Sequence, residues 1–501
     1  MKVDVIGGGI GGMMAALLLA KRGFAVRLLE KNARLGGRLA YESAHTGLSG
    51  QSEYRIDQGP TIVLLPDMLL GVLEQAGIDR SALTLLECEP LCRIHYADGT
   101  VLHKWRDRRK QEEELERLFP GERDGYARFM RDMEQRFVAG KEAFLDRTFM
   151  RKRDFFTLRN MRLLASMRAY KSVRAVARSY FRDERLVDAF SLQTLYIGGA
   201  PFASPGLYAL LPYAEHAFGV WYVKGGYASL VPVLERKLRE QGVDVRLGTA
   251  VSQLIIEGGV CRGVVAGGER LMCDAVVFNG DYPQLGALLP EAEQANKRYA
   301  GLRKRYEPSS GCVLVYLGVS RRWADSAAHQ FFLPPSLERS LRRIFSDGRL
   351  PEEPSYYVFN PTVIDESAAP VGESVLYMLI PCPPDAGIDW ATEADALVRR
   401  VLADAERRAF PGLREAIRWQ SVRTPADARA DGLYMGGSFG IAPTLRQSAL
   451  FRPQIVAPAP AGLYAVGASV HPGGGIPIVM QGAQLLAQHL KDGGTSHELA
   501  H

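Results

Sequence analysis

The feature that most constrains the fold of this 501-residue chain is a glycine-rich turn that joins a short apolar strand to a helix near the N-terminus. The predicted strand covers residues 3–6, the predicted helix residues 13–21, and a second predicted strand residues 24–29. The turn reads G-x-G-x-x-G. A strand, this turn, a helix and a second strand, in this order, are typical of a parallel α/β unit that binds a dinucleotide.

Each glycine of the turn has its own physical role. Gly7 permits the tight turn, Gly9 lets the backbone approach a pyrophosphate, and Gly12 lets the helix pack closely on the strand. The start of the helix offers unpaired N–H groups and a partial positive charge to phosphate groups. Glu30, 18 residues after Gly12, can accept hydrogen bonds from ribose hydroxyl groups. An ordinary glycine-rich surface turn is the alternative, and the complete set of flanking elements argues against it.

The residues after the second strand favour FAD over NAD as the dinucleotide. Gly36 and Gly37 allow a further close approach of the backbone, and Arg38 follows them directly. A guanidinium group can meet a diphosphate with a fork of N–H donors. An ordinary surface charge at Arg38 is the alternative interpretation.

A second glycine-rich loop, residues 467–475, lies between a strand and a helix over residues 478–490. Pro477 suits the first turn of this helix, where its missing N–H leaves no intrahelical hydrogen bond unmade. The positive end of the helix could face an anionic group such as a reduced flavin ring. His471 could be a catalytic base, but the sequence shows no charged partner for it, and shaping the loop before Pro472 is the other interpretation.

Composition and cysteine spacing exclude several classes of protein. A chain of this length is too long for one compact core, which indicates two or more domains. The net charge of +6 does not indicate a nucleic-acid partner. The six cysteines contain no C-x-x-C pair, so we expect neither a metal site nor a disulfide framework, and a reducing cytoplasm fits. The early first strand leaves no room for a signal peptide, and no apolar stretch is long enough to span a membrane.

These patterns predict an α/β fold with a Rossmann-type FAD-binding domain and a second, α+β domain that binds the substrate. Both domains are expected to be discontinuous in sequence. The FAD-binding domain is assigned to residues 1–105, 225–290 and 455–501. The substrate-binding domain is assigned to residues 106–224 and 291–454, and it includes a helical region that could face a membrane.

Residues 151–185 are predicted to form a basic amphipathic helix. They contain eleven Lys or Arg residues and three acidic residues, with apolar and basic side chains at helical spacing on different faces. Such a helix can lie on an anionic membrane surface. A domain helix with one buried and one solvated face has the same pattern, so both interpretations stay open. Residues 195–224, rich in aromatic and aliphatic side chains, can line a long apolar cavity or form plain core.

The motifs together resemble those of the bacterial carotenoid desaturases, of the phytoene and dehydrosqualene (diapophytoene) desaturase type, within the flavin amine oxidase-like group. The matching segments are residues 5–12, 29–31, 35–38, 57–61, 198–202, 219–226, 437–439, 447–453 and 467–473. They span nearly the whole chain. The middle and last segments are more specific to this family than the first ones, which many flavoproteins share.

The resemblance implies a soluble or peripheral protein that binds FAD without a covalent link. It also suggests that Val251 meets the adenine end of FAD through its backbone, although a plain sheet residue is the alternative there. With the motifs above, the candidate cofactor-binding residues are Gly7, Gly9, Gly12, Glu30, Lys31, Gly37, Arg38, Gly59, Pro60, Thr61, Val251, Gly467, Ala468, Gly475, Ile476 and Pro477.

The substrate that the resemblance implies is a long, uncharged polyene of the membrane. The protein is therefore expected in the cytoplasm, peripherally associated with the inner face of the membrane, which favours the membrane interpretation of residues 151–185. The implied reaction is desaturation of a linear C30 or C40 carotenoid precursor, dehydrosqualene or phytoene, by hydride transfer to flavin N5 and loss of a proton. An electron acceptor such as oxygen or a quinone is expected.

The sequence alone does not decide between alternatives for the catalytic residues, the reaction and the presence of a flavin. The catalytic residues are unknown, because relatives carry an acidic residue at a position where this chain has Asn160. Some relatives oxidise a terminal methyl group to an aldehyde, and the triple glycine Gly473-Gly474-Gly475 leans towards such an oxidase. A flavin-free lipid-binding escort protein on the same fold is the alternative from another class, and the combined glycine motifs argue against it.

Overall fold

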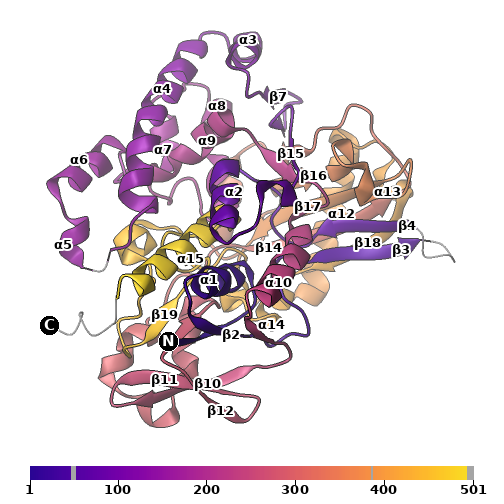
Figure 1. Ribbon diagram of the computed structural model, residues 1–501. Helices are drawn as coiled ribbons and strands as arrows, with labels where there is room; N and C mark the ends of the chain where they lie inside the picture. Colours follow the sequence, from indigo (N-terminus) through magenta and orange to yellow (C-terminus); the bar gives the residue numbers. More distant parts are fainter. Residues whose placement is uncertain (47–51, 150, 385–386, 494–501) are drawn as a thin grey trace.

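The computed structural model describes residues 1–46, 52–149, 151–384 and 387–493, and it confirms the predicted N-terminal unit (Figure 1). The unit consists of β1 (Lys2–Ile6), α1 (Ile10–Ala20) and β2 (Ala25–Leu29). The two strands pair in parallel, with Val5 opposite Leu28. The helix begins earlier than predicted, because Gly9 is its N-cap and the last glycines of the turn already lie in its first turn.

The N-terminal unit belongs to a five-stranded parallel sheet whose strands come from distant parts of the chain. In spatial order the strands are β19 (Leu463–Ala465), β13 (Ala275–Phe278), β1, β2 and β9 (Asp244–Arg246). The helices that pack with α1 over this sheet are α2 (Pro66–Gln75), α10 (Leu230–Glu240) and α15 (Ile476–Lys491) (Figure 1). A small antiparallel sheet, β10 (Val251–Glu257), β11 (Val260–Ala266) and β12 (Glu269–Met272), lies beside it.

A seven-stranded mixed sheet forms the second body of the molecule. Its strands in spatial order are β18 (Ile417–Arg423), β14 (Gly311–Val319), β17 (Ser374–Cys382), β16 (Tyr356–Phe359), β15 (His329–Phe332), β6 (Cys92–His95) and β7 (Val101–Lys104). The predicted hairpin of β6 and β7 is confirmed. The hairpin lies within residues 1–105, which the sequence assigned to the FAD-binding domain, yet it extends the other sheet because β6 pairs in parallel with β15. The division into domains otherwise stays a prediction.

The two faces of the seven-stranded sheet have different partners. Val313, Val315 and Leu317 of β14 point towards α12 (Trp390–Arg408) and form one core with it. The alternate residues, Leu314 and Tyr316, point to the opposite face, as the two-residue period of a strand requires. That opposite face packs against a layer of helices that includes α3 (Arg108–Leu118), α4 (Arg123–Gly140) and α9 (Leu210–Phe218).

The single amphipathic helix predicted for residues 151–185 is wrong. The segment forms short helices, namely α5 (Lys152–Phe155), α6 (Leu158–Ser166), α7 (Val173–Ala177) and the start of α8 (Glu184–Ala189). Thr157 and Ser172 each accept a hydrogen bond from a backbone N–H at the start of α6 and α7, so both residues begin new helices. Arg168, with φ of 51°, turns the chain between them.

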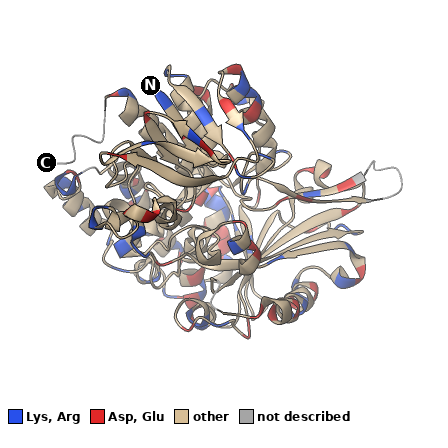
Figure 2. Cartoon of the chain, turned by 90° about the horizontal axis from the view of Figure 1, so that it is seen from below, with Lys and Arg blue, Asp and Glu red and all other residues tan. Residues whose placement is uncertain are grey.

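The basic residues of this segment therefore do not share one face. Arg174 is buried and pairs with Asp188, Glu184 and Glu338, so it is a structural residue of the helical layer. Over the described residues, Lys and Arg are interspersed with Asp and Glu (Figure 2). Among the described residues, no helix is both long enough and apolar enough to cross a membrane.

Candidate cofactor and substrate site

A large cavity of about 1380 Å³ is lined by residues of both sheets. From the parallel sheet, the lining includes Ile6, Leu29 and Phe278, which are the last residues of β1, β2 and β13. Ligands of open parallel sheets bind outside the carboxyl ends of the strands. The cavity therefore lies where the sequence predicts a dinucleotide, and it continues towards the seven-stranded sheet.

The glycines of the first turn differ in whether the protein itself requires them. A Cβ atom at Gly7 would lie 2.7 Å from the carbonyl oxygen of Asn279, and one at Gly12 would lie 2.0 Å from that of Gly7, so the protein itself excludes side chains there. Gly9 differs, because its φ of −71° suits any residue and an added Cβ would meet only the Asn279 amide nitrogen, at 3.2 Å. The space beside Gly9 thus belongs to the cavity.

Glu30 is held in place at the end of β2. One carboxylate oxygen accepts the N–H of Gly8 at 2.6 Å, and the other accepts the N–H of Asn32 at 2.8 Å. A carboxylate has about four acceptor positions, so these two bonds leave capacity for the hydroxyl groups of a ribose. The side chain is buried and lines the cavity.

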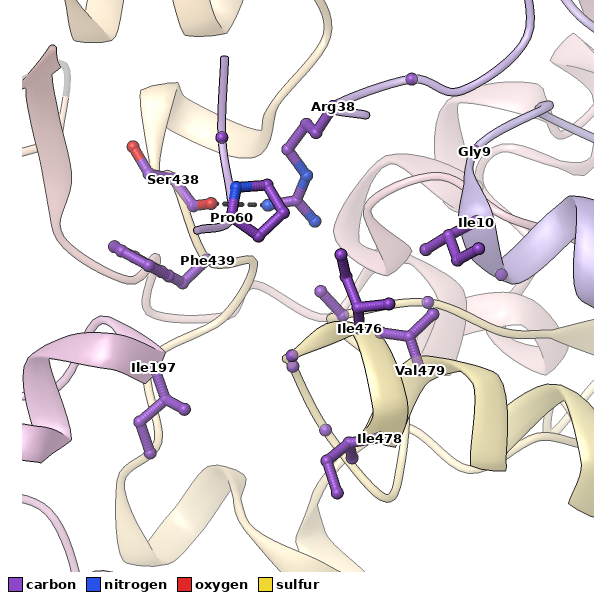
Figure 3. Close-up of a pocket in the computed structure, with 18 of the residues that line it drawn as sticks. Gly9, Ile10, Arg38, Pro60, Ile197, Ser438, Phe439, Ile476, Ile478 and Val479 are labelled. Carbon is purple, nitrogen blue, oxygen red and sulfur yellow. Dashed lines mark hydrogen bonds between the residues drawn. The ribbon is translucent and has the colours of Figure 1, made fainter. Parts of the chain in front are cut away.

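Two cations that line the cavity donate hydrogen bonds to the segment 431–438. Arg38 donates a hydrogen bond to the carbonyl oxygen of Ser438 (Figure 3), and Lys31 donates one to that of Asp431 at 2.9 Å. A guanidinium group has five N–H donors, so the contact with Ser438 does not exhaust those of Arg38. Arg38 therefore connects two segments that are distant in sequence, and it also places a positive charge on the cavity wall.

The C-terminal loop forms another part of the wall. Gly467 and Gly475 have φ of 123° and 95°, which favour glycine, and α15 begins at Ile476 with Pro477 in its first turn. Figure 3 shows this first turn beside the cavity, with Ile476 and Val479 facing Ile10 at the start of α1. The first N–H groups of a helix have no intrahelical acceptor, so a partial positive charge lies at this wall.

Of the sixteen candidate cofactor residues, all except Gly12 line this one cavity. Gly12 instead packs against Gly7, as its predicted role in helix packing requires. Gly59, Pro60, Thr61 and Val251 join the others although they lie on separate segments. Their contacts with a cofactor stay a prediction.

The opposite part of the cavity is apolar. Its wall includes one face of the seven-stranded sheet, where Leu314, Leu379, Tyr357 and Phe331 lie side by side on neighbouring strands. The helical layer covers it with Phe137, Met167, Leu195, Ile197, Leu207, Leu210, Leu211 and Ala214. Part of the segment 195–224 thus lines the cavity, which was one of the two interpretations of that segment. The contribution of the sheet was not foreseen, because strand patterns do not reveal which face borders a cavity.

A buried charged cluster supports the apolar wall. The hydroxyl group of Tyr196, which lines the cavity, donates to Glu215 at 2.6 Å, and Gln193 donates to the same carboxylate at 2.9 Å. Lys104 forms an ion pair with Glu215, and the two side chains are 0% and 1% exposed. Sequence reasoning missed this cluster, although an acidic residue within an apolar helix is a signal for a buried, paired charge.

Two residues that the sequence singled out have structural roles. The imidazole Nε2 of His471 contacts the carbonyl oxygen of Arg147 at 2.8 Å, and burial lowers the pKa of this histidine to about 4, so it is neutral at pH 7 and donates that hydrogen bond. Asn160 donates to the carbonyl oxygen of Phe155 at 2.9 Å and closes the turn between α5 and α6. Neither side chain lines the cavity, and the geometry favours the loop-shaping role of His471.

The triple glycine of the C-terminal loop enlarges the cavity at one point. A Cβ atom at Gly474 would lie 3.7 Å from the carbonyl oxygen of Phe439 and 3.9 Å from the Cβ of Ala468, which are ordinary contact distances. The backbone therefore does not require glycine here. The missing side chain leaves room in the part of the wall next to α15.

A parallel sheet of the dinucleotide-binding type shares one cavity with an apolar-walled second sheet, and this arrangement fits an enzyme with a nucleotide cofactor and an apolar substrate. The sequence profile of the family described as flavin containing amine oxidoreductase matches residues 10–490. The chain belongs to this family, in its carotenoid desaturase branch. It is accordingly a flavin-dependent oxidoreductase, which argues against the flavin-free escort protein.

Similar proteins align with nearly the whole length of this chain. The chain is 46% identical to 4,4'-diapolycopen-4-al dehydrogenase of Metabacillus indicus, covering 97% of this chain and 96% of that protein. It is 34% identical to the zeta-carotene-forming phytoene desaturase of Myxococcus xanthus, covering 98% and 93%. Among solved structures, an oxidoreductase from Methanosarcina mazei matches with a TM-score of 0.67 and 18% identity over 97% of this chain and 100% of the other, which shows the shared fold.

Proposed function

We propose that the chain binds FAD non-covalently and uses it to oxidise a linear C30 or C40 carotenoid. The observation that carries this proposal is the continuity of the cavity, which has the candidate cofactor residues at one end and an apolar wall at the other. The residues present fit FAD. The open space at Gly9 suits a pyrophosphate, Glu30 a ribose and Arg38 a diphosphate, while the start of α15 suits the flavin ring.

The chemistry divides between the cofactor and the protein. A bound flavin supplies a two-electron acceptor that takes a hydride from carbon. In desaturation the substrate loses that hydride and, from the neighbouring carbon, a proton, so one C–C bond becomes a double bond. The protein excludes water with the strand residues around Leu314 and Leu379 and with the helix residues around Met167, and it holds the polyene along the sheet face.

Oxidation at the end of the carotenoid is the second candidate reaction, and two observations favour it. The relative with 46% identity is named for the dehydrogenation of a carotenoid aldehyde, whereas the phytoene desaturase of M. xanthus is 34% identical. Gly474 also leaves extra room beside the start of α15. A hydrated aldehyde that loses a hydride from carbon and a proton from oxygen becomes a carboxylic acid, so the flavin chemistry is unchanged.

Pigment analysis distinguishes the two reactions. We expect a bacterium that supplies dehydrosqualene, phytoene or a diapolycopene aldehyde to convert at least one of them when it expresses this chain. Products with longer absorption wavelength and unchanged oxygen content would establish a desaturase. Conversion of the aldehyde to a more oxidised end group, with the hydrocarbons untouched, would establish the terminal oxidation. If all three substrates remain unchanged while the protein carries FAD, the proposed substrate class is wrong.

We also propose that the surface of α5 and α6 contacts the membrane from which the substrate comes. Four large apolar side chains are exposed there or nearby, namely Val138, Phe156, Leu158 and Tyr170 at 68%, 52%, 67% and 71%. Exposed basic residues accompany them, namely Arg151, Lys152, Arg153, Arg159, Arg162 and Lys171. Lys141 lines the cavity and has a side chain that is 40% exposed, so the cavity reaches the surface close to this region.

The double substitution Phe156→Asp and Leu158→Asp tests this surface. We expect its binding to vesicles that contain anionic lipid to weaken at least tenfold, because two inserted apolar side chains are lost and two negative charges face the headgroups. Co-sedimentation with the vesicles measures the effect. Val371→Asp is the control, since Val371 is fully exposed in a loop of the seven-stranded sheet. Equal loss in both proteins, or no loss in either, would refute the proposed surface.

A further inference from the structure

Arg452 is a buried cation that has no anionic hydrogen-bond partner among the residues that the structure describes. Its side chain lines the cavity but is only about 5% exposed. One terminal nitrogen donates to the carbonyl oxygen of Gln447 at 3.2 Å and the other donates to that of Ala468. In the described part of the chain, Nε has no hydrogen-bond partner, and no carboxylate forms an ion pair with the guanidinium.

Such an arrangement is costly unless an anion balances it in the working protein. Burial lowers the pKa of Arg452, but a guanidinium stays protonated near neutral pH. A charge removed from water without a counterion destabilises the fold. The carboxylate that acts on this charge at longer range is Asp281, and its oxygens already accept hydrogen bonds from the Ser469 hydroxyl and the Tyr434 N–H, both at 2.8 Å.

The position of Arg452 indicates which anion its positive charge stabilises. Its partner Ala468 belongs to the C-terminal loop that leads into α15, and this loop lines the same cavity. The N-terminus of α15, a 16-residue helix, contributes a second positive feature to that wall. Figure 3 shows the first turn of α15 with the side chains of Ile476 and Ile478 beside the open space.

We infer that the charge of Arg452 raises the reduction potential of the bound flavin. The inference rests on the proposed binding of FAD in this cavity. When the carotenoid gives up a hydride, the flavin ring gains a negative charge, and a nearby fixed cation in a poorly solvated cavity stabilises that charge. Arg452 acts through its electric field, because both terminal nitrogens of its guanidinium already donate to backbone carbonyl oxygens.

Two substitutions of Arg452 separate the effect of its charge from the effect of its hydrogen bonds. Arg452→Gln keeps an amide donor for a carbonyl oxygen but removes the charge, whereas Arg452→Lys keeps the charge but loses the forked donors. We expect the equilibrium constant for flavin reduction, measured against a dye of known potential, to fall about tenfold in Arg452→Gln. This change corresponds to about 30 mV for a two-electron couple. The lysine variant should stay within threefold of the wild-type protein.

The control is Arg408→Gln, because Arg408 also donates to two carbonyl oxygens, those of Leu333 and His95, but does not line the cavity. Its flavin should titrate like that of the wild-type protein. Equal shifts in Arg452→Gln and Arg452→Lys, or no shift in Arg452→Gln, would overturn the inference and leave Arg452 as a structural residue.

If glutamine prevents folding, Arg452→Met removes the same charge and is measured in its place. A wild-type protein that binds no flavin would instead refute the proposed function itself, and the inference with it.

Discussion

Replacing Gly9 by valine is expected to weaken FAD binding at least a hundredfold while leaving the fold intact. The backbone angles of Gly9 suit valine, and an added Cβ would meet only the amide nitrogen of Asn279 at 3.2 Å. The new side chain would instead fill the cavity at the start of α1, where the pyrophosphate must approach the backbone. A hundredfold loss is about 2.7 kcal/mol of binding free energy. Titration of the apoprotein with FAD measures it.

Two further glycines provide the comparison. Gly71 in α2 has open space around it, so Gly71→Val should bind FAD like the wild-type protein. Gly12→Val should fail to fold correctly, because its Cβ would lie 2.0 Å from the carbonyl oxygen of Gly7. A folded Gly9→Val protein with unchanged FAD affinity would contradict the proposed location of the pyrophosphate.

Lys104→Met is expected to lower the free energy of unfolding by about 3–5 kcal/mol, because it leaves the buried carboxylate of Glu215 without its cation. The hydrogen bonds from Gln193 and Tyr196 remain, but they do not neutralise the charge. Because Tyr196 lines the cavity, we expect substrate binding to weaken as well. Denaturation by urea, followed by fluorescence, measures the loss of stability.

The matched comparison is a pair of the same type at the surface. Lys110 pairs with Glu89, and their side chains are 51% and 58% exposed, so Lys110→Met should lower the stability far less than Lys104→Met. The double substitution Lys104→Met and Glu215→Leu should recover much of the lost stability, since it removes both buried charges together. If Lys104→Met lowers the free energy of unfolding no more than Lys110→Met does, the ion pair of Lys104 and Glu215 does not stabilise the fold as proposed.

The structural elements around the candidate site that the sequence predicted correctly are those with local requirements. The turn at Gly7 and the loop before Pro477 each join a strand to a helix, and glycine, proline and strand residues at fixed spacing are enough to define them. The capping residues Thr157 and Ser172 were equally local signals, and they explain why the long helix was wrong. In that segment the apolar residues recur at helical spacing across both helix starts, so their periodicity alone did not reveal where α6 and α7 begin.

The remaining parts depend on contacts between distant segments. β6 joins the seven-stranded sheet by pairing with β15, more than 200 residues further along the chain. The pairing of Lys104 with Glu215, and the use of one face of that sheet as a cavity wall, arise only when these segments meet. A single sequence carries the apolar pattern of each strand but not the identity of its neighbour.

The order of strands in the parallel sheet also determines when, during synthesis, this sheet and the cover of α1 can be completed. The helix α1 is buried from Gly11 to Leu19, and part of its cover is α15, which begins more than 450 residues later. At about 5–20 residues per second, a ribosome needs roughly 20–90 s to synthesise that interval. Until then the apolar surface of α1 lacks this cover and β13 lacks its neighbour β19. A complete candidate site therefore forms only after α15 has been synthesised, because the start of this helix is one wall of the cavity.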